Sequence, residues 1–204
     1  MNVAVQKAQW GVNYCAGYSA FLIRKGDFIS AGIRWFEHWD DVPNLPSPSH
    51  AFIITGKDST VEAFGDGIHT GTLSGYLHDM TCAVLVRRPL HYTPDMGVRI
   101  VQAANAHLGD HYNYALIGAM AVSNSLLGHG LDMLTRGWFS RAVDGLADRK
   151  RYAICSQLVA LAMQPQEEVM ALGVLARPAY TITPMDLVRD QYIYEPDDYA
   201  TELI

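Results

Sequence analysis

A cysteine stands where a helix is expected to begin, in the stretch Tyr152-Ala-Ile-Cys-Ser-Gln-Leu-Val159. Apolar residues follow it at helical spacing until Pro165, so the sequence predicts an amphipathic helix over residues 155–164, with Ser156 helping to cap its first turn. Unpaired backbone N–H groups and the positive end of the helix dipole favour a thiolate at such a position. Cys155 is therefore a candidate nucleophile. The competing interpretation is a buried cysteine that packs as a small apolar residue.

A histidine and a glutamate offer the base and the orienting carboxylate that a thiol nucleophile needs. His50 precedes the run 51–55, and Glu62 lies in the run 60–64, with the turn residues Gly-Lys-Asp-Ser between the two runs. This pattern predicts a hairpin. If Phe52 faces Glu62 across it, the histidine and the carboxylate share one face of the sheet. A shift by one residue would turn the carboxylate to the opposite face, and no triad would form.

The elements that must position these residues are strands followed by helices. Strands are expected from Asp27 to about Ser30, at 51–55, 60–64 and 82–87, and at Tyr192–Tyr194. Helices are expected at 94–108, closed by Gly109, over most of the chain from 110 to Met163, and for one turn at 184–189. This order predicts an α+β domain with an antiparallel sheet packed against helices. The chain has 204 residues, half of them hydrophobic, and a single domain is expected.

The net charge and the hydropathy of the chain argue against two classes of binding partner, nucleic acids and membranes. The net charge is −6, and the densest basic cluster is Arg149-Lys-Arg151, so neither nucleic acid nor an anionic membrane is an expected partner. The most apolar window, residues 115–134, carries polar side chains and three glycines, so no integral membrane span is expected. A pair of buried helices or a lid suits this window better. Association with a membrane surface is the weaker alternative.

The cysteine count and the N-terminus bear on the compartment. Three cysteines are too few for a disulfide framework, and we expect them to be reduced. The N-terminus shows no basic region ahead of an apolar core, so the chain is expected to be cytoplasmic as synthesised. Delivery to the cell envelope by a phage particle or a secretion machine stays open.

Several short motifs occur in an order that resembles a known family. They are Gly26-Asp27, Ser49-His50, Val61-Glu62-Ala63, Gly109-Asp-His-Tyr-Asn-Tyr114, Ile154-Cys-Ser-Gln-Leu-Val159 and Thr183-Pro-Met-Asp-Leu187. The set resembles the circularly permuted branch of the NlpC-type cysteine peptidases, papain-fold proteins of the YiiX/YebB-like kind. In the unpermuted family the cysteine precedes the histidine, whereas here it follows, as the permuted branch requires. The resemblance implies one papain-like domain over residues 1–204, with a mainly helical insertion at about 115–150 before the nucleophile helix.

The resemblance also implies roles for individual residues. The nucleophile, the general base and the orienting partner would be Cys155, His50 and Glu62. Support for an oxyanion would come from Tyr112, Tyr114 or Ser156. No cofactor and no metal are expected. One departure is Gln157, where the permuted family usually carries a glutamate, and this departure concerns a contact around the nucleophile and not the nucleophile itself.

The function implied is that of a cysteine hydrolase that cleaves an amide bond through a thioester intermediate, as a cell-wall peptide amidase or endopeptidase does. Its substrate would be a peptide or a peptidoglycan fragment. Two alternatives stay open. One is a thiol acyltransferase or thioesterase acting on lipid or acylated substrates, with the segment 115–134 gathering the acyl chain. The other is a catalytically silent structural or binding module, such as a component of a phage or a secretion system.

Rival site residues fit less well. Cys15 would restore the unpermuted order, but no helix pattern like that after Cys155 follows it, and Cys82 lies in an apolar strand pattern. His107 and His111 are four residues apart, as metal ligands on a helix can be. However, the glutamate that a zinc peptidase carries next to the first histidine is missing, and Gly109 interrupts the helix.

Overall fold

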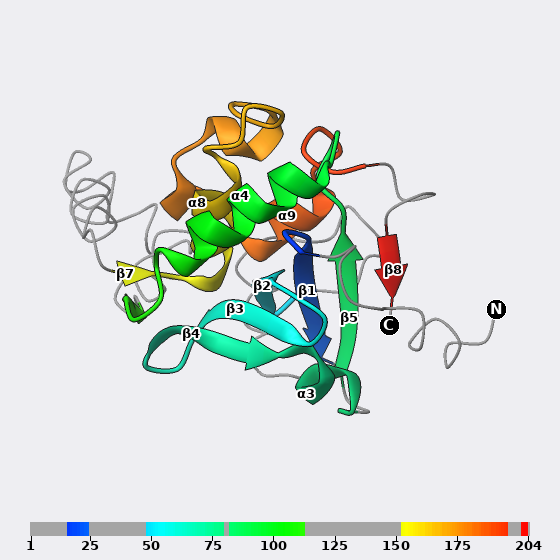
Figure 1. Ribbon diagram of the computed structural model, residues 1–204, viewed down its shortest axis with the longest axis vertical. Coiled ribbons are helices and arrows are strands. Elements are labelled where there is room, and N and C mark those ends of the chain that lie inside the picture. Colours follow the sequence, from blue (N-terminus) through cyan, green and yellow to red (C-terminus); the bar gives the residue numbers. More distant parts are fainter. Residues whose placement is uncertain (1–15, 25–47, 80–81, 113–151, 196–200, 204) are drawn as a thin grey trace, which may run out of the picture.

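The computed structural model describes residues 16–24, 48–79, 82–112, 152–195 and 201–203 (Figure 1). The strands in these ranges are β1 Ser19–Arg24, β2 His50–Ile54, β3 Ser59–Phe64, β4 Gly67–Thr72, β5 Cys82–Arg87, β6 His111–Tyr112, β7 Tyr152–Ala153 and β8 Thr201–Leu203. They form one eight-stranded sheet in the order β7-β6-β4-β3-β2-β1-β5-β8. The pairings are antiparallel except for the short parallel pair β6–β7.

Helices cover both faces of this sheet unequally. The α-helices of the described ranges are α3 Leu73–Leu77, α4 Pro94–Asn105, α8 Cys155–Met163 and α9 Pro184–Arg189, with 3-10 turns η1 Gly173–Ala176 and η2 Ala179–Thr181. Figure 1 shows α4, α8 and α9 together on one side of the sheet and α3 on the other. The predicted α+β class, with a mainly antiparallel sheet and packed helices, is confirmed. None of these helices has both the length and the apolar character needed to cross a bilayer.

The strand alternation sorts the core into two clusters. In β1, Phe21 faces the larger cluster with α4, α8 and α9, while Ala20 and Leu22 face the smaller cluster with α3. In β2, Ala51 and Ile53 likewise belong to the larger cluster. Successive side chains of a strand point to opposite faces, so a strand covered on both sides is buried throughout. All five residues of β2 are buried for this reason.

The central hairpin of the sheet agrees with the sequence prediction. Strands β2 and β3 pair in the register Phe52↔Glu62, Ile53↔Val61 and Ile54↔Thr60. The turn between them contains Gly-Lys-Asp-Ser as expected, and Thr55 closes it by donating its backbone N–H to the Ser59 carbonyl. The register that places the histidine and the carboxylate on one face is therefore the one that forms.

Helix α8 begins at Cys155 as predicted, but it is not amphipathic. Its buried residues cover every side of the helix, and only Leu161 is partly exposed. The helix packs against β2, α4, η2 and α9, so no face is left for water. The cap also differs from the prediction, because the backbone N–H of Ile154 donates to Oε1 of Gln157 at 3.4 Å while Ser156 bonds elsewhere.

Other differences concern element ends and short strands. Helix α4 stops at Asn105 and the chain turns to Gly109, which has a φ of +83°. The strand expected at 192–194 is wrong, since Tyr194 makes only an isolated bridge with Pro89. The mainly helical stretch after 110 is wrong at the two-residue strands β6 and β7. The strand expected at 27–30 and the insertion at 115–150 lie outside the described residues.

Replacing Gly173 by alanine should lower the free energy of unfolding by about 2 kcal/mol. Gly173 has a φ of +46°, and an added Cβ would lie 2.1 Å from a carboxylate oxygen of Asp190. That carboxylate cannot move cheaply, because it accepts hydrogen bonds from the backbone N–H groups of Val174, Tyr192 and Ile193. Chemical denaturation measures the change. Gly109→Ala is the matched control, with a positive φ and open space around its Cβ, and equal losses in the two variants would contradict the clash with Asp190.

Candidate active site

Three side chains form one hydrogen-bonded chain at the start of α8. Nε2 of His50 lies 2.9 Å from Oε2 of Glu62, and the same imidazole is hydrogen-bonded to Cys155. Because Glu62 uses Nε2, Nδ1 is the ring nitrogen left for the thiol. The exposed fractions of Cys155, His50 and Glu62 are 7%, 6% and 3%, so water does little to stabilise a charge on any of them. The structure thus brings together the three residues that the sequence singled out.

The hairpin positions the histidine and the glutamate. Phe52 lies directly opposite Glu62, so His50 is two residues further along the same face of β2. The rings of Phe52 and Phe64 flank the imidazole, each with its centroid 5.7 Å from that of His50. Phe52 is fully buried, whereas Phe64 is 55% exposed, so one side of His50 faces the core and the other faces an apolar ring at the surface.

The imidazole is a strong base in this position. Burial is the largest single influence on the pKa of His50, and it lowers it. Hydrogen bonds and charge interactions with Cys155 and Glu62 act in the opposite direction and together outweigh burial, so they raise the pKa of His50 from 6.5 to about 9. At neutral pH the ring is therefore an imidazolium.

The thiol shows the complementary shift. Burial is the largest single influence on the pKa of Cys155 and raises it, but the hydrogen bond and the positive charge of His50, together with backbone hydrogen bonds, lower it by more. Hydrogen bonds from the backbone at Ala51 and Ser156 add to the lowering of this pKa. The first-turn N–H groups of α8 and the start of β2 thus converge on the sulfur. Both shifts favour a thiolate–imidazolium pair over a neutral thiol and imidazole.

The carboxylate of Glu62 is surrounded by donors. The Tyr76 hydroxyl donates to Oε2 and the Thr60 hydroxyl donates to Oε1, the latter at 3.3 Å. Burial raises the pKa of Glu62, but the hydrogen bonds from His50 and Tyr76 and the nearby charges of His50 and His69 lower it below its ordinary value. His69 is the cross-strand neighbour of Glu62 on β4. The glutamate is therefore an anion that faces the imidazolium.

Replacing Gly71 by alanine should lower the pKa of His50 below about 9. An added Cβ would lie 1.8 Å from Oε1 of Glu62 and 2.7 Å from the Thr60 hydroxyl. Both atoms end flexible side chains, so the fold survives and the carboxylate moves. A displaced anion stabilises the imidazolium less. NMR titration of the His50 ring measures the shift. The control is Gly75→Ala, whose Cβ would meet only the Thr72 hydroxyl at 3.2 Å, and an unchanged His50 pKa in Gly71→Ala would contradict the prediction.

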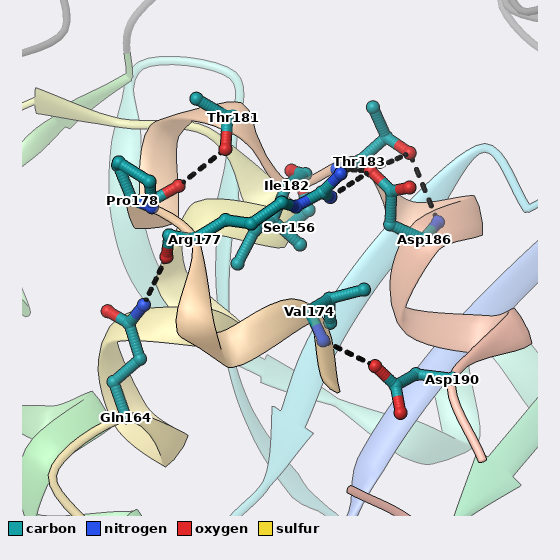
Figure 2. Close-up of polar contacts among 10 residues, drawn as sticks. All are labelled: Ser156, Gln164, Val174, Arg177, Pro178, Thr181, Ile182, Thr183, Asp186 and Asp190. Carbon is teal, nitrogen blue, oxygen red and sulfur yellow. Dashed lines mark hydrogen bonds and ion pairs between the residues drawn. The ribbon is translucent and has the colours of Figure 1, made fainter. Parts of the chain in front are cut away.

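Ser156, expected to support an oxyanion, makes a different contact. It is fully buried on α8, and its hydroxyl donates to the carbonyl of Ile182 at 2.6 Å. Figure 2 shows the segment from Val174 to Asp190 beside this serine, with Arg177 reaching Asp186 in an ion pair of 2.7 Å. The hydroxyl of Ser156 thus fixes the first turn of α8 to that segment. Only its backbone N–H is directed to the sulfur.

The other predicted support residues lie as follows. Tyr112 is on β6, its backbone pairs with Ala153 two residues before Cys155, and its ring packs against the larger core cluster. Tyr114 lies outside the described residues. A role of either tyrosine at an oxyanion stays a prediction. Gln157, which replaces the glutamate of the resembled family, is buried and binds the backbone N–H of Ile154.

Sequence reasoning missed Tyr76, Thr60 and Gly71. A signal existed for Thr60, because it lies two residues before Glu62 on one strand and therefore on the same face. No local signal existed for Tyr76 or Gly71. Their contacts depend on how β4 and α3 fold back over β3, which the residues around them do not encode as a motif.

Two further features of the described part lie apart from this site. A hollow of about 400 Å³ lies between η1 and α9, and none of the three central residues lines it. Within the described ranges, no group of three or more acidic, histidine or cysteine side chains is arranged to hold a metal ion. His107, a rival ligand in the sequence, instead contacts Oδ2 of Asp110 at 3.1 Å.

Comparison of the chain with models of known protein families finds no match, and comparison with the curated proteins finds none either.

Proposed function

We propose that this protein is a cysteine hydrolase with a papain-like fold of the permuted NlpC type, in which Cys155 cleaves an amide bond. The hydrogen-bonded chain of Cys155, His50 and Glu62 at the start of a buried helix carries the proposal. A buried thiolate–imidazolium pair is costly to maintain, and burial of this kind is typical of a nucleophile rather than a packing residue. The motif order supports the permuted family in particular.

The proposed reaction is acyl transfer to sulfur and then to water. The Cys155 thiolate attacks the amide carbonyl carbon, and backbone N–H groups in the first turn of α8 stabilise the oxyanion. The imidazolium of His50 gives its proton to the leaving nitrogen, the C–N bond breaks, and a thioester remains. His50 then takes a proton from water as the hydroxide attacks the thioester. The C–S bond breaks and the thiolate returns.

The resemblance suggests cell-wall stem peptides as the amide substrates. Long-range attraction would contribute little to their binding, since both the chain and peptidoglycan are negatively charged. Selection therefore has to come from short-range contacts at the site.

A second candidate function is acyl transfer or thioester hydrolysis on lipid or acylated substrates. The exposed ring of Phe64 favours it, because this ring borders the imidazole of His50 and offers an apolar surface to an acyl chain. The substrates separate the two candidates. Release of a new amine from muropeptides supports the hydrolase, and turnover of acyl esters or thioesters supports the second.

Alkylation of the native protein by iodoacetamide tests the shared premise. Cys155 should react with a midpoint well below the ordinary thiol pKa of about 8.5, because His50 lowers its pKa. Hydrolysis should rise with pH through this low midpoint and fall again near pH 9, where His50 loses the proton that the leaving group needs. Mass spectrometry after alkylation across pH 4–10 locates the modified cysteine, with Cys15 and Cys82 as internal references.

An ordinary thiol profile at Cys155 would remove the activated nucleophile and with it both enzyme candidates. The fold would then serve as a structural or binding module. If Cys155 is activated but the protein hydrolyses acyl esters and no muropeptide, the proposed site stands and the proposed substrate is wrong.

A further inference from the structure

We propose that Tyr76 is a positioning residue of this site, which holds the Glu62 carboxylate toward His50. The inference rests on the proposed function, because a positioning role has meaning only if the three side chains perform catalysis. The Tyr76 hydroxyl donates to Oε2 of Glu62, the same oxygen that contacts Nε2 of His50. One carboxylate oxygen thus receives the phenol and the imidazole together.

The phenol ring is itself fixed in place. It stacks on Phe52 with a centroid distance of 5.1 Å and an interplanar angle of 24°. Phe52 is the residue directly opposite Glu62 in the hairpin. The ring on which Tyr76 stacks and the carboxylate to which it donates therefore belong to cross-strand neighbours, and a movement of the phenol away from the carboxylate would also disrupt the ring contact.

Helix α3, which carries Tyr76, is tied to the same hairpin. The backbone N–H and the hydroxyl of Ser74 both donate to the carboxylate of Asp58, at 2.6 and 2.8 Å. Asp58 belongs to the turn between β2 and β3, and its carbonyl accepts the backbone N–H of Leu73. Leu73 is buried in the smaller core cluster. The position of the phenol is thus set by the hairpin that also presents His50 and Glu62.

The rest of the carboxylate is equally enclosed. The Thr60 hydroxyl donates to Oε1, and Gly71 leaves no room for a side chain beside that oxygen. The ionisable groups that act on Glu62 are His50 on β2, His69 on β4 and Tyr76 on α3, and Cys155 acts in turn on His50. The Tyr76 phenol donates a hydrogen bond and carries no positive charge. It can hold the anion without competing for the proton that His50 carries.

Tyr76→Phe removes the hydroxyl and keeps the ring that stacks on Phe52. The released carboxylate should orient and stabilise the imidazolium less, so the thiolate should form at higher pH. We expect the acid limb of iodoacetamide alkylation at Cys155 to move up by about one pH unit. We also expect kcat on the identified substrate to fall about tenfold, with KM unchanged, because a positioning residue acts through the imidazole and not through substrate binding.

The control is Tyr192→Phe, which removes the hydroxyl of a tyrosine that is 70% exposed and lines the hollow between η1 and α9. Its alkylation profile should match that of the unmodified protein. A double-mutant cycle with Glu62→Gln separates positioning from general structural support. Tyr76→Phe should add no further shift once Glu62 is replaced.

The outcomes distinguish this inference from the proposed function. An ordinary thiol profile in the unmodified protein removes the proposed function and the inference together. A low midpoint in the unmodified protein, with the Tyr76→Phe profile superimposed on it, overturns the inference alone. A shift that persists in the Glu62→Gln background also overturns it, because the phenol would then act independently of the carboxylate. If Tyr76→Phe fails to fold while Gly71→Ala leaves the acid limb unmoved, placement of the carboxylate does not matter and the inference fails as well.

Discussion

Cys155→Ala should reduce amide hydrolysis by about 10⁴-fold or more, because in our proposal no other group forms the covalent intermediate. The fold should persist. Alanine fits the first turn of α8, and the free energy of unfolding should fall by about 1 kcal/mol for the lost sulfur contacts. The measurement is amine release from muropeptides, paired with chemical denaturation of the same variant.

Cys82→Ala is the matched control, because it removes a thiol from strand β5 and leaves the thiol of α8 in place. This variant should retain hydrolysis. Full activity in Cys155→Ala would mean that another cysteine is the nucleophile. A loss of several kcal/mol in the free energy of unfolding would instead identify Cys155 as a core residue. That is the competing interpretation, and it is a serious one for a side chain with an exposed fraction of only 7%.

His50→Ala should make Cys155 an unreactive thiol at neutral pH. The hydrogen bond and the charge of His50 are what lower the pKa of Cys155, while burial raises it. Without the imidazole, burial and the backbone N–H groups remain as the main influences on the thiol, so its pKa should rise. The rate of alkylation at pH 7 should fall about tenfold or more.

His107→Ala provides the comparison, since this histidine contacts Asp110 and not the site. Its alkylation profile should equal that of the unmodified protein. If the profile of His50→Ala also stays unchanged, the reactivity of Cys155 would have to come from the helix start alone. His50 would then have no part in the mechanism.

The part of the site that could be predicted is the part whose geometry is local. His50 and Glu62 lie on one hairpin with a short turn, so alternation and register suffice to place them on one face. Helix α8 and the one-turn helix α9 were also predictable, from a helical apolar pattern in the first and from Pro184 at the first position of the second. The proximity of the hairpin to α8 could be expected only from the resemblance to a known family, because no local sequence pattern connects residues so far apart in the chain.

Physical properties of three elements explain why the sequence did not predict them. Strand β1 is an interior strand of the sheet, between β2 and β5, with both faces covered, so Ala20, Phe21 and Leu22 are all buried and show no alternation. Strand β4 is mostly exposed and polar, and it gives no apolar period. Helix α3 has five residues, too few to display a helical repeat. Since Tyr76 lies on α3 and Gly71 on β4, the surroundings of Glu62 were missed together with these elements.

His50 and the residues that contact its carboxylate partner Glu62 lie within residues 50–76, whereas Cys155 follows more than a hundred residues after His50. Contacts within a short stretch close small loops, and the contact to Cys155 closes a much larger one, so we expect the contact to Cys155 to form later. A growing or partly unfolded chain therefore carries a cysteine with the ordinary pKa of a thiol, mostly protonated at neutral pH. If Cys155 is the nucleophile that we propose, its reactivity therefore depends on the packing of α8 against the sheet, and the unfinished chain carries an ordinary thiol at this position.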